Sequence, residues 1–213
     1  MSLPDLRLPK VIGHRGAALR APENTLAGFR KAAALGCRWV EFDVRLSLDD
    51  VAVVFHDDRL ERVTGSSGPI GGTPFSTLKA LDAGSFFAPD YKGEAIPSLE
   101  ETLLLLRGLG LAFDLELKAD PGRERALAEV AARTLEALWP RALPRPLVTS
   151  FEPTALTHFA RRAPEVARGY LVTALPRNWR DEAAGLGVCA VICDHRRLAP
   201  EAARAVKEAG YPL

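Results

Sequence analysis

Apolar and polar residues alternate along residues 40–44, where two acids separate three apolar side chains (Val40, Glu41, Phe42, Asp43 and Val44). Successive side chains of a β-strand point to opposite faces of the sheet. The pattern therefore predicts a strand with both carboxylates on one face and the apolar groups on the other. Because Trp39 and Leu46 flank the acids, we expect the acidic face to be buried and to hold a cation.

A second apolar run, at residues 51–55, follows the turn sequence Leu48-Asp49-Asp50-Val51. A short polar turn between two such runs is typical of a β-hairpin. If Asp49 and Asp50 are the two turn residues, residue 46 pairs with 53, 44 with 55 and 43 with 56. This register predicts that His56 lies opposite Asp43 on the acidic face.

The rest of the chain alternates between apolar runs typical of strands and amphipathic stretches typical of helices. The expected strands are 10–13, 39–46, 111–118, 146–151, 167–172 and 188–193, and the expected helices are 22–36, 98–109, 121–138, 153–162, 176–184 and 200–209. This order predicts βαβ units and a parallel sheet in a single domain over residues 1–213. A seventh strand could begin at Tyr211.

Residues 57–97 break this rhythm with many glycines and prolines. An unstructured loop of about 40 residues is uncommon in a compact domain, so we expect an insertion with short helices of its own. A helix around 77–83 is one candidate, and Phe86, Phe87 and Tyr91 are expected to pack the insertion down or to line a pocket.

Overall composition excludes several classes of protein. The formal net charge is +1, with 47% hydrophobic and 26% charged residues, which indicates no general attraction to nucleic acid or to an anionic membrane. No apolar run reaches the roughly 18 residues that a membrane span needs, and the first residues lack a signal-peptide core. Three cysteines, an odd number, favour reduced thiols and a cytoplasmic location.

Three carboxylates are candidates for a metal site. Chemistry in parallel α/β folds gathers at the carboxyl ends of the strands. Asp114 and Glu116 lie on one face of the strand at 111–118 and would bring two further acids toward Glu41 and Asp43, so that three carboxylates could converge. Oxygen ligands of this kind suit a hard cation such as Mg²⁺ or Ca²⁺. A salt-bridge cluster with nearby basic residues is the structural alternative.

Basic residues occur beside these acids. Arg15 follows the first expected strand and Lys118 ends the strand at 111–118, so both could contact a phosphate. His14 and His56 could then serve as general acid and base. This set of side chains favours cleavage of a phosphodiester.

Three further polar residues allow two interpretations each. Asp114 could form part of the site or make a buried hydrogen bond. Glu23 and Asn24 could belong to the site or simply begin a helix.

Several ordered motifs resemble those of the glycerophosphodiester phosphodiesterase family: His14-Arg15-Gly16, Pro22-Glu23-Asn24-Thr25, Glu41-x-Asp43, His56-Asp57, Ile96-Pro97-Ser98-Leu99-Glu100-Glu101 and Glu116-x-Lys118. The resemblance implies a TIM (β/α)₈-type barrel with a small insertion at about 57–97, after strand two. It also implies a divalent cation on Glu41, Asp43 and Glu116, with glycerol 3-phosphate and an alcohol as products. Catalysis by His14 and His56 and phosphate contacts from Arg15 and Lys118 are implied in the same way.

The chain departs from the family pattern in two places. Asp49-Asp50 stands where the family usually has Asp-Gly, so we expect a slightly altered turn. No Trp-Thr-Val-Asn-like segment follows Tyr211, so the last barrel strands are apparently absent from this sequence. A barrel of this type typically needs about 250 residues, which leaves a truncated chain, an open sheet or completion by a partner as alternatives.

Other functions compete with metal-dependent hydrolysis. One is a related phospholipid phosphodiesterase or lyase that releases a cyclic phosphate, and another is a truncated, non-catalytic phosphate-binding module. A Schiff-base role for Lys118 is disfavoured because neighbouring acids would raise its pKa. The expected partner is a small glycerophosphodiester, not a nucleic acid or a membrane, and the expected protein is a monomer or homodimer.

Overall fold

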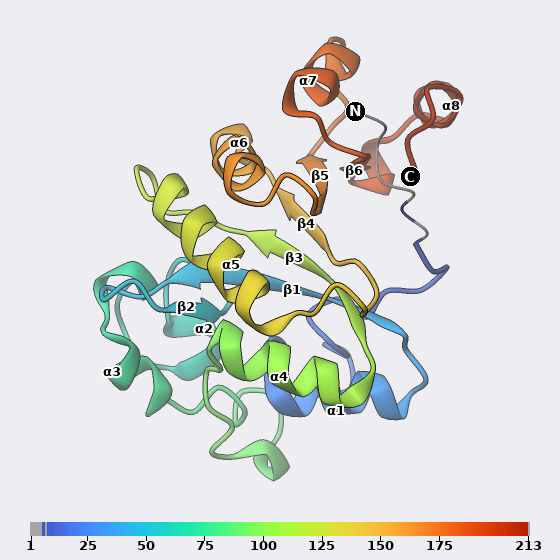
Figure 1. The fold of residues 1–213 in the computed structure, drawn as a ribbon. Helices are drawn as coiled ribbons and strands as arrows, with labels where there is room; N and C mark the ends of the chain where they lie inside the picture. Colours follow the sequence, from blue (N-terminus) through green and yellow to red (C-terminus); the bar gives the residue numbers. More distant parts are fainter. Residues whose placement is uncertain (1–5, 7, 213) are drawn as a thin grey trace.

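A computed structural model describes residues 6 and 8–212 as a twisted sheet with helices packed along one face (Figure 1). The six strands have the order β2-β1-β3-β4-β5-β6. β2 is antiparallel to β1, and all other neighbouring strands are parallel. The strands are β1 (Trp39–Leu46), β2 (Ala52–Val54), β3 (Ala112–Leu117), β4 (Leu147–Ser150), β5 (Ala167–Val172) and β6 (Ala190–Cys193).

The helices follow the strands in the predicted alternation. They are α1 (Leu26–Ala34), α2 (Glu61–Thr64), α3 (Phe75–Lys79), α4 (Leu99–Leu109), α5 (Glu124–Leu138), α6 (Pro153–Arg162), α7 (Trp179–Leu186) and α8 (Pro200–Glu208), with short 3₁₀ turns at Ile70–Gly72, Pro89–Tyr91 and His195–Arg197. Among the described residues, no helix is both long enough and apolar enough to cross a membrane. The mostly parallel sheet and its helices confirm the prediction of an α/β fold of the TIM-barrel type.

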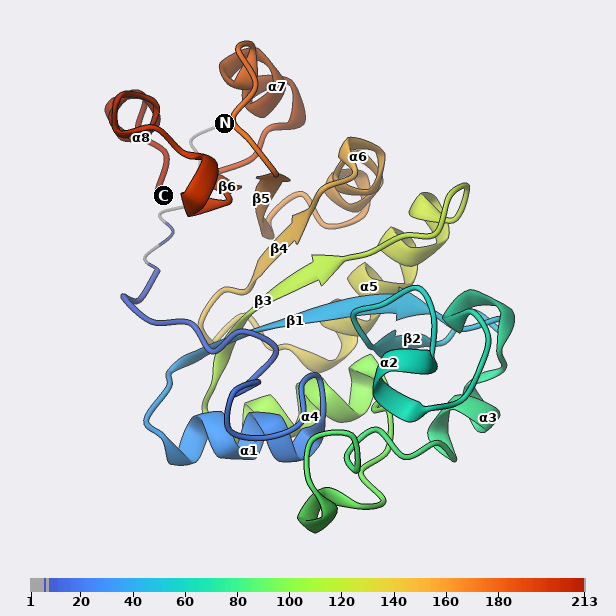
Figure 2. The same cartoon turned by 180° about the vertical axis from the view of Figure 1, so that it is seen from behind.

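The alternating pattern of β1 and β3 separates a dry face from a polar one. Val40, Phe42 and Val44 of β1 and Phe113, Leu115 and Leu117 of β3 are fully buried in one core with α1, α4, α5 and α6, and Phe42 and Phe113 meet there with ring centroids 5.4 Å apart. The acidic residues of both strands point to the opposite face, which Figure 2 shows without a covering helix over β3. Burial of the apolar face thus fixes which way the carboxylates point.

The hairpin register differs from the predicted one by one residue. Val44 pairs with Val54 and Leu46 with Ala52, whereas the sequence suggested 55 and 53. The loop has three residues instead of two, and Asp50 takes a left-handed conformation with φ 59°. Three-residue hairpin loops commonly end in such a left-handed residue, so the extra residue shifts the pairing.

The expected first strand is reduced to a single bridge. Gly13 donates its N–H to the Trp39 carbonyl (2.9 Å) and accepts from the Glu41 N–H (2.8 Å), and Gly13–Val40 is an isolated bridge. Val11 is 66% exposed, so residues 10–12 lack the burial that would hold a longer edge strand. At the other end, Tyr211 and Pro212 form no strand, and β6 is the edge of the sheet among the described residues.

The insertion folds over β2 and has its own small core. α2, α3 and the 3₁₀ turn at Ile70–Gly72 confirm the expectation of short helices. Its apolar side chains pack with Val53 and Phe55, and the Val54 N–H donates to the Pro97 carbonyl (2.8 Å). The insertion is therefore a packed extension of the barrel wall beside the polar face.

Candidate functional site

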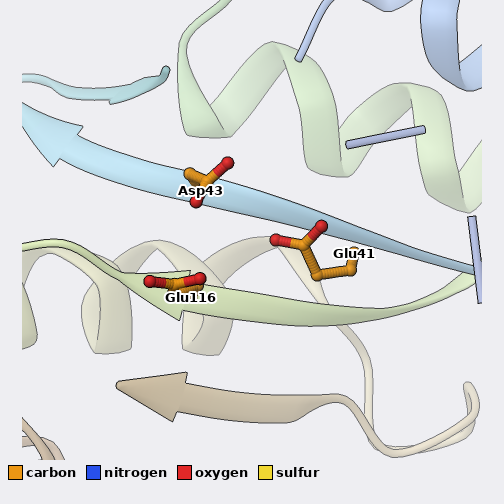
Figure 3. Close-up of side chains that lie close together, drawn as sticks. All are labelled: Glu41, Asp43 and Glu116. Carbon is orange, nitrogen blue, oxygen red and sulfur yellow. The ribbon is translucent and has the colours of Figure 1, made fainter. Parts of the chain in front are cut away.

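Glu41, Asp43 and Glu116 come together on the polar face of the sheet (Figure 3). The parallel register sets Asp43 beside Glu116, and Glu41 lies two residues earlier on β1. Each side chain offers one oxygen, and these oxygens lie within 4.8 Å of one another. The cluster could therefore hold a metal ion, and its all-oxygen donor set fits hard cations.

The electrostatics of the cluster favour added positive charge. Burial raises the pKa of Glu41 well above its usual value, and the charges of Asp43 and Asp114 add to this effect. Burial followed by the charge of Asp43 also raises the pKa of Glu116. Neighbouring buried carboxylates repel each other, so a divalent cation between them would offset that repulsion.

Arg15 approaches the cluster from the loop that follows Gly13. Its backbone N–H donates to Glu41 Oε2 (2.9 Å), and its Nη1 donates to Glu23 Oε1 (2.9 Å). Its Nε lies 3.4 Å from Asp43 Oδ2 but is buried without a hydrogen bond in the described structure. Arg15 has φ 50°, and a Cβ on Gly13 would lie only 2.3 Å from the Gly16 carbonyl oxygen, so the tight loop requires a glycine at 13.

Lys118 lies on the other side of the acids. Its Nζ is 3.1 Å from Glu116 Oε1 and 3.7 Å from Asp43 Oδ1. Arg15 and Lys118 therefore both approach Asp43, as the sequence suggested, and a salt-bridge cluster does exist. The cluster leaves cationic side chains beside the same carboxylates, which is the arrangement expected around a bound phosphate.

Asn24 contacts Asp43 of the acidic cluster directly and Glu23 contacts Arg15 beside it, while Thr25 serves as the cap of α1. Asn24 Nδ2 donates to Asp43 Oδ2 (2.8 Å), and the Asp43 N–H donates to Asn24 Oδ1 (3.3 Å). Of the two interpretations given to Glu23 and Asn24, the structure favours a place at the site. Asp114 instead accepts a hydrogen bond from Thr149 Oγ1 (2.8 Å), and burial raises its pKa to about 8.

The two histidines lie beside the acids in different environments. His14 is 70% exposed, with Nε2 3.9 Å from Glu41 Oε2. His56 follows the end of β2 and is 30% exposed, and its Nδ1 is 2.6 Å from Asp57 Oδ1. Burial lowers the pKa of both imidazoles. Because the chain leaves strand geometry after Val54, His56 reaches the polar face although the predicted register was wrong.

Two arginines that sequence reasoning missed hold His56 in place. Arg45 Nε donates to the His56 carbonyl oxygen (2.9 Å), and Arg62 binds the carboxylate of Asp57. Arg45 continues the alternation of Glu41 and Asp43 along β1, so its position on the polar face could have been inferred. Arg62 lies in the insertion, where no sequence pattern linked it to the site.

Comparison with known proteins identifies the family. The model of the glycerophosphoryl diester phosphodiesterase family matches residues 14–213, a region that begins at His14 and includes every candidate site residue. The chain belongs to this family. The resemblance inferred from the motifs is confirmed.

Solved structures agree with this assignment. A phosphodiesterase of Oleispira antarctica, solved in complex with the product sn-glycerol-3-phosphate, is 40% identical with a TM-score of 0.93, covering 96% of this chain and 82% of that chain. A glycerophosphodiester phosphodiesterase of Agrobacterium tumefaciens is 30% identical with a TM-score of 0.78, covering 96% and 84%. Both likenesses extend over nearly all of this family member.

Curated relatives are longer than the matched segment. YhdW of Bacillus subtilis is 42% identical over 114 residues, which cover 53% of this chain and 46% of YhdW. A glycerophosphodiester phosphodiesterase of Caldanaerobacter subterraneus is 32% identical over 166 residues, covering 76% of this chain and 65% of that protein. The chain thus spans between about half and two thirds of the length of these relatives.

Proposed function

We propose that this chain hydrolyses glycerophosphodiesters to glycerol 3-phosphate and an alcohol, with Mg²⁺ or Ca²⁺ held by Glu41, Asp43 and Glu116. The observation that carries the proposal is the cluster of three carboxylate oxygens between the cationic side chains of Arg15 and Lys118. The family assignment and the product complex of the Oleispira antarctica relative support the choice of substrate class.

The basic residues would bind the phosphate. When bound, the divalent cation would supply positive charge to a non-bridging phosphate oxygen. Arg15 Nε, which is buried without a hydrogen bond among the described residues, is a donor available to a phosphate oxygen. Lys118 Nζ adds a second positive charge beside Glu116. Preorganised charges of this kind stabilise the negative charge that develops on the phosphate in the transition state.

The histidines would divide the proton transfers. Asp57 accepts the Nδ1 proton of His56, which leaves Nε2 as the ring atom that can exchange a proton. One of the two imidazoles, His14 or His56, takes the proton of the nucleophile, which is water or the glycerol hydroxyl of the substrate. Attack by water gives glycerol 3-phosphate directly, whereas attack by the glycerol hydroxyl gives a cyclic phosphate that water must then open to give glycerol 3-phosphate. The other imidazole donates a proton to the leaving alcohol oxygen as its bond to phosphorus breaks.

The first test is hydrolysis of glycerophosphocholine by the purified chain, before and after chelation and with Mg²⁺, Ca²⁺ or Mn²⁺ added back. We expect release of glycerol 3-phosphate that is lost on chelation and restored by one cation. Absence of turnover with every cation would contradict the proposal. A cyclic phosphate as the end product, detected by phosphorus NMR without release of glycerol 3-phosphate, would support the lyase alternative instead.

A matched pair of variants tests the cation site. Glu41→Gln removes one carboxylate charge from the cluster and should cut turnover at least about 100-fold, because charge stabilisation by a metal is worth several kcal/mol. Glu129→Gln removes a surface charge of α5 that pairs, among the described residues, only with Arg125 and should leave turnover unchanged. Equal turnover in the two variants would exclude Glu41 from the site.

The cellular setting is part of the same proposal. Cys37, Cys189 and Cys193 are free in the structure, which suits the reduced thiols of a cytoplasmic enzyme. We propose a cytoplasmic monomer or homodimer acting on a small glycerophosphodiester. Light scattering of the purified chain would distinguish the two assembly states.

A further inference from the structure

Arg62 joins two carboxylates that lie on different segments of the chain. Its Nε donates to Asp57 Oδ2 (2.6 Å) and its Nη2 to Asp57 Oδ1 (3.0 Å). Its Nη1 donates to Glu23 Oε2 (2.9 Å) and its Nη2 also donates to Glu23 Oε1 (2.7 Å). One guanidinium thus makes two forked contacts, one to each carboxylate.

Each of these carboxylates holds a side chain of the proposed site. Asp57 Oδ1 lies 2.6 Å from His56 Nδ1. Glu23 Oε1 accepts from Arg15 Nη1 at 2.9 Å. A continuous set of charge-assisted contacts therefore runs from His56 through Arg62 to Arg15.

The insertion places Arg62 in this position. Val63, the next residue of α2, is buried in the core that the insertion shares with β2. Anchoring of α2 through Val63 fixes where the Arg62 side chain can reach. The insertion therefore does more than cover the sheet, because it supplies the cation that lies between the carboxylates of Asp57 and Glu23.

The exposure of Arg62 alone would argue against a role for it, because isolated ion pairs on the surface contribute little to the free energy of unfolding. The Arg62 side chain is 45% exposed, but Asp57 and Glu23 are only 23% and 14% exposed. Such contacts make a measurable energetic contribution when their geometry is forked and when several charges form a network. The hydrogen bonds from Arg62 are also the largest cause that lowers the pKa of Asp57, to about 2.

An ionised Asp57 has a defined effect on His56. A carboxylate without a proton can only accept a hydrogen bond, so it selects the form of the imidazole that carries a proton on Nδ1. Nε2 is then the ring atom left to exchange a proton with the substrate. Arg62 determines indirectly which ring nitrogen of His56 carries the proton, because it holds Asp57 against the imidazole.

We propose that Arg62 is a positioning residue for the hydrolysis, acting on His56 through Asp57 and on Arg15 through Glu23. The inference rests on the function proposed above, in which His56 transfers a proton and Arg15 binds phosphate. It assigns to the insertion a part in completing the site.

The test compares Arg62→Gln with Arg59→Gln. Arg59 lies in the same insertion, and its one side-chain partner in the part of the chain that the structure describes is Glu61 on the surface, where the two side chains are 56% and 43% exposed. R62Q should lower kcat at least about 10-fold, since small misplacements of reacting groups have effects of up to about 100-fold. R59Q should stay within about twofold of the unmodified chain.

Arg62→Lys tests whether the fork or only the charge is needed. An ammonium group cannot form two bidentate contacts, so R62K should remain well below the unmodified chain in kcat. Full kcat in R62K, or equal kcat in R62Q and R59Q, would overturn the proposal. Urea unfolding of all variants separates these effects from loss of the fold.

Nitrogen NMR of the histidine rings gives a readout that does not depend on turnover. In the unmodified chain the His56 ring should carry its proton on Nδ1, and R62Q should change the Nδ1 and Nε2 shifts of His56 while R59Q should not. A chain that shows these shifts but hydrolyses nothing would refute the proposed function and still support the contact made by Arg62. Unchanged His56 shifts in R62Q would overturn the inference.

Discussion

Substitution of Asn24 is the most discriminating test of how the loop at 22–25 supports the acidic cluster. Asn24 is 3% exposed and exchanges two hydrogen bonds with Asp43, one from its Nδ2 and one to its Oδ1. Its backbone is left-handed, with φ 55°. Asn24→Ala and Asn24→Gly both remove the side-chain contacts, but only alanine must also adopt the unfavourable backbone conformation.

The magnitude follows from these two contributions. A hydrogen bond to a charged group contributes about 1.5–3 kcal/mol, so we expect Asn24→Gly to lower the free energy of unfolding by about 2 kcal/mol. The left-handed conformation costs an L-residue about 1–2 kcal/mol, of which the greater unfolded-state entropy of glycine offsets roughly 0.4–1 kcal/mol. Asn24→Ala should therefore be the less stable variant, by about 0.5–1 kcal/mol, which reverses the usual order of alanine and glycine.

Urea unfolding monitored by circular dichroism measures the difference. Asn178→Ala is the matched control, because Asn178 is exposed, has φ −95° and, within residues 6 and 8–212, donates only to Glu182 on the surface. The control should stay within about 0.5 kcal/mol of the unmodified chain. Greater stability of Asn24→Ala than of Asn24→Gly, or values within about 0.5 kcal/mol of the control for both, would refute the argument. Calorimetric titration should also show about 10- to 100-fold weaker cation binding in both Asn24 variants.

Two further predictions concern the cap of α4 and the pH dependence of stability. Ser98→Ala removes a capping box in which Ser98 Oγ accepts from the Glu101 N–H at 3.1 Å. The free energy of unfolding should fall by about 1 kcal/mol, which thermal unfolding would show as a Tm about 2–4 °C lower. An unchanged Tm would contradict this prediction. The pKa of Asp57 is lowered to about 2, so its contribution to stability is present above its unfolded value and is lost as the pH falls from about 4 to about 2. The stability advantage of the unmodified chain over Asp57→Asn should shrink over that interval in acid-unfolding measurements, and a constant difference would show that Asp57 gains nothing from Arg62.

The sequence was most informative where one physical requirement decided the structure. Burial of Val40, Phe42 and Phe113 on one side of the sheet left Glu41 and Asp43 only the other side, so alternation alone predicted their common face. The capping box of α4 has a similarly local origin, because Ser98 and Glu101 lie three positions apart in the sequence and together satisfy free N–H groups of that helix end.

Prediction failed where local rules allowed two outcomes of similar energy. Leu48, Asp49 and Asp50 suit either a two-residue or a three-residue hairpin loop, and the left-handed conformation of Asp50 decides between them. The strand expected at 10–13 has enough apolar residues, but a strand also needs a partner along its length. Only Gly13 finds one in the described structure, so the segment forms a single bridge.

Long-range contacts of charged side chains were the least predictable part of the site. Arg62 is separated from Glu23 by 39 positions, and nothing local to either residue encodes their contact. The contact depends on where the insertion packs, which the apolar residues of its core determine. Glu23 and Asp57 can be recognised from sequence because they lie in motifs. Their shared partner Arg62 can be identified only when the packing of the insertion is known. The residue that connects them is therefore visible only once the fold is known.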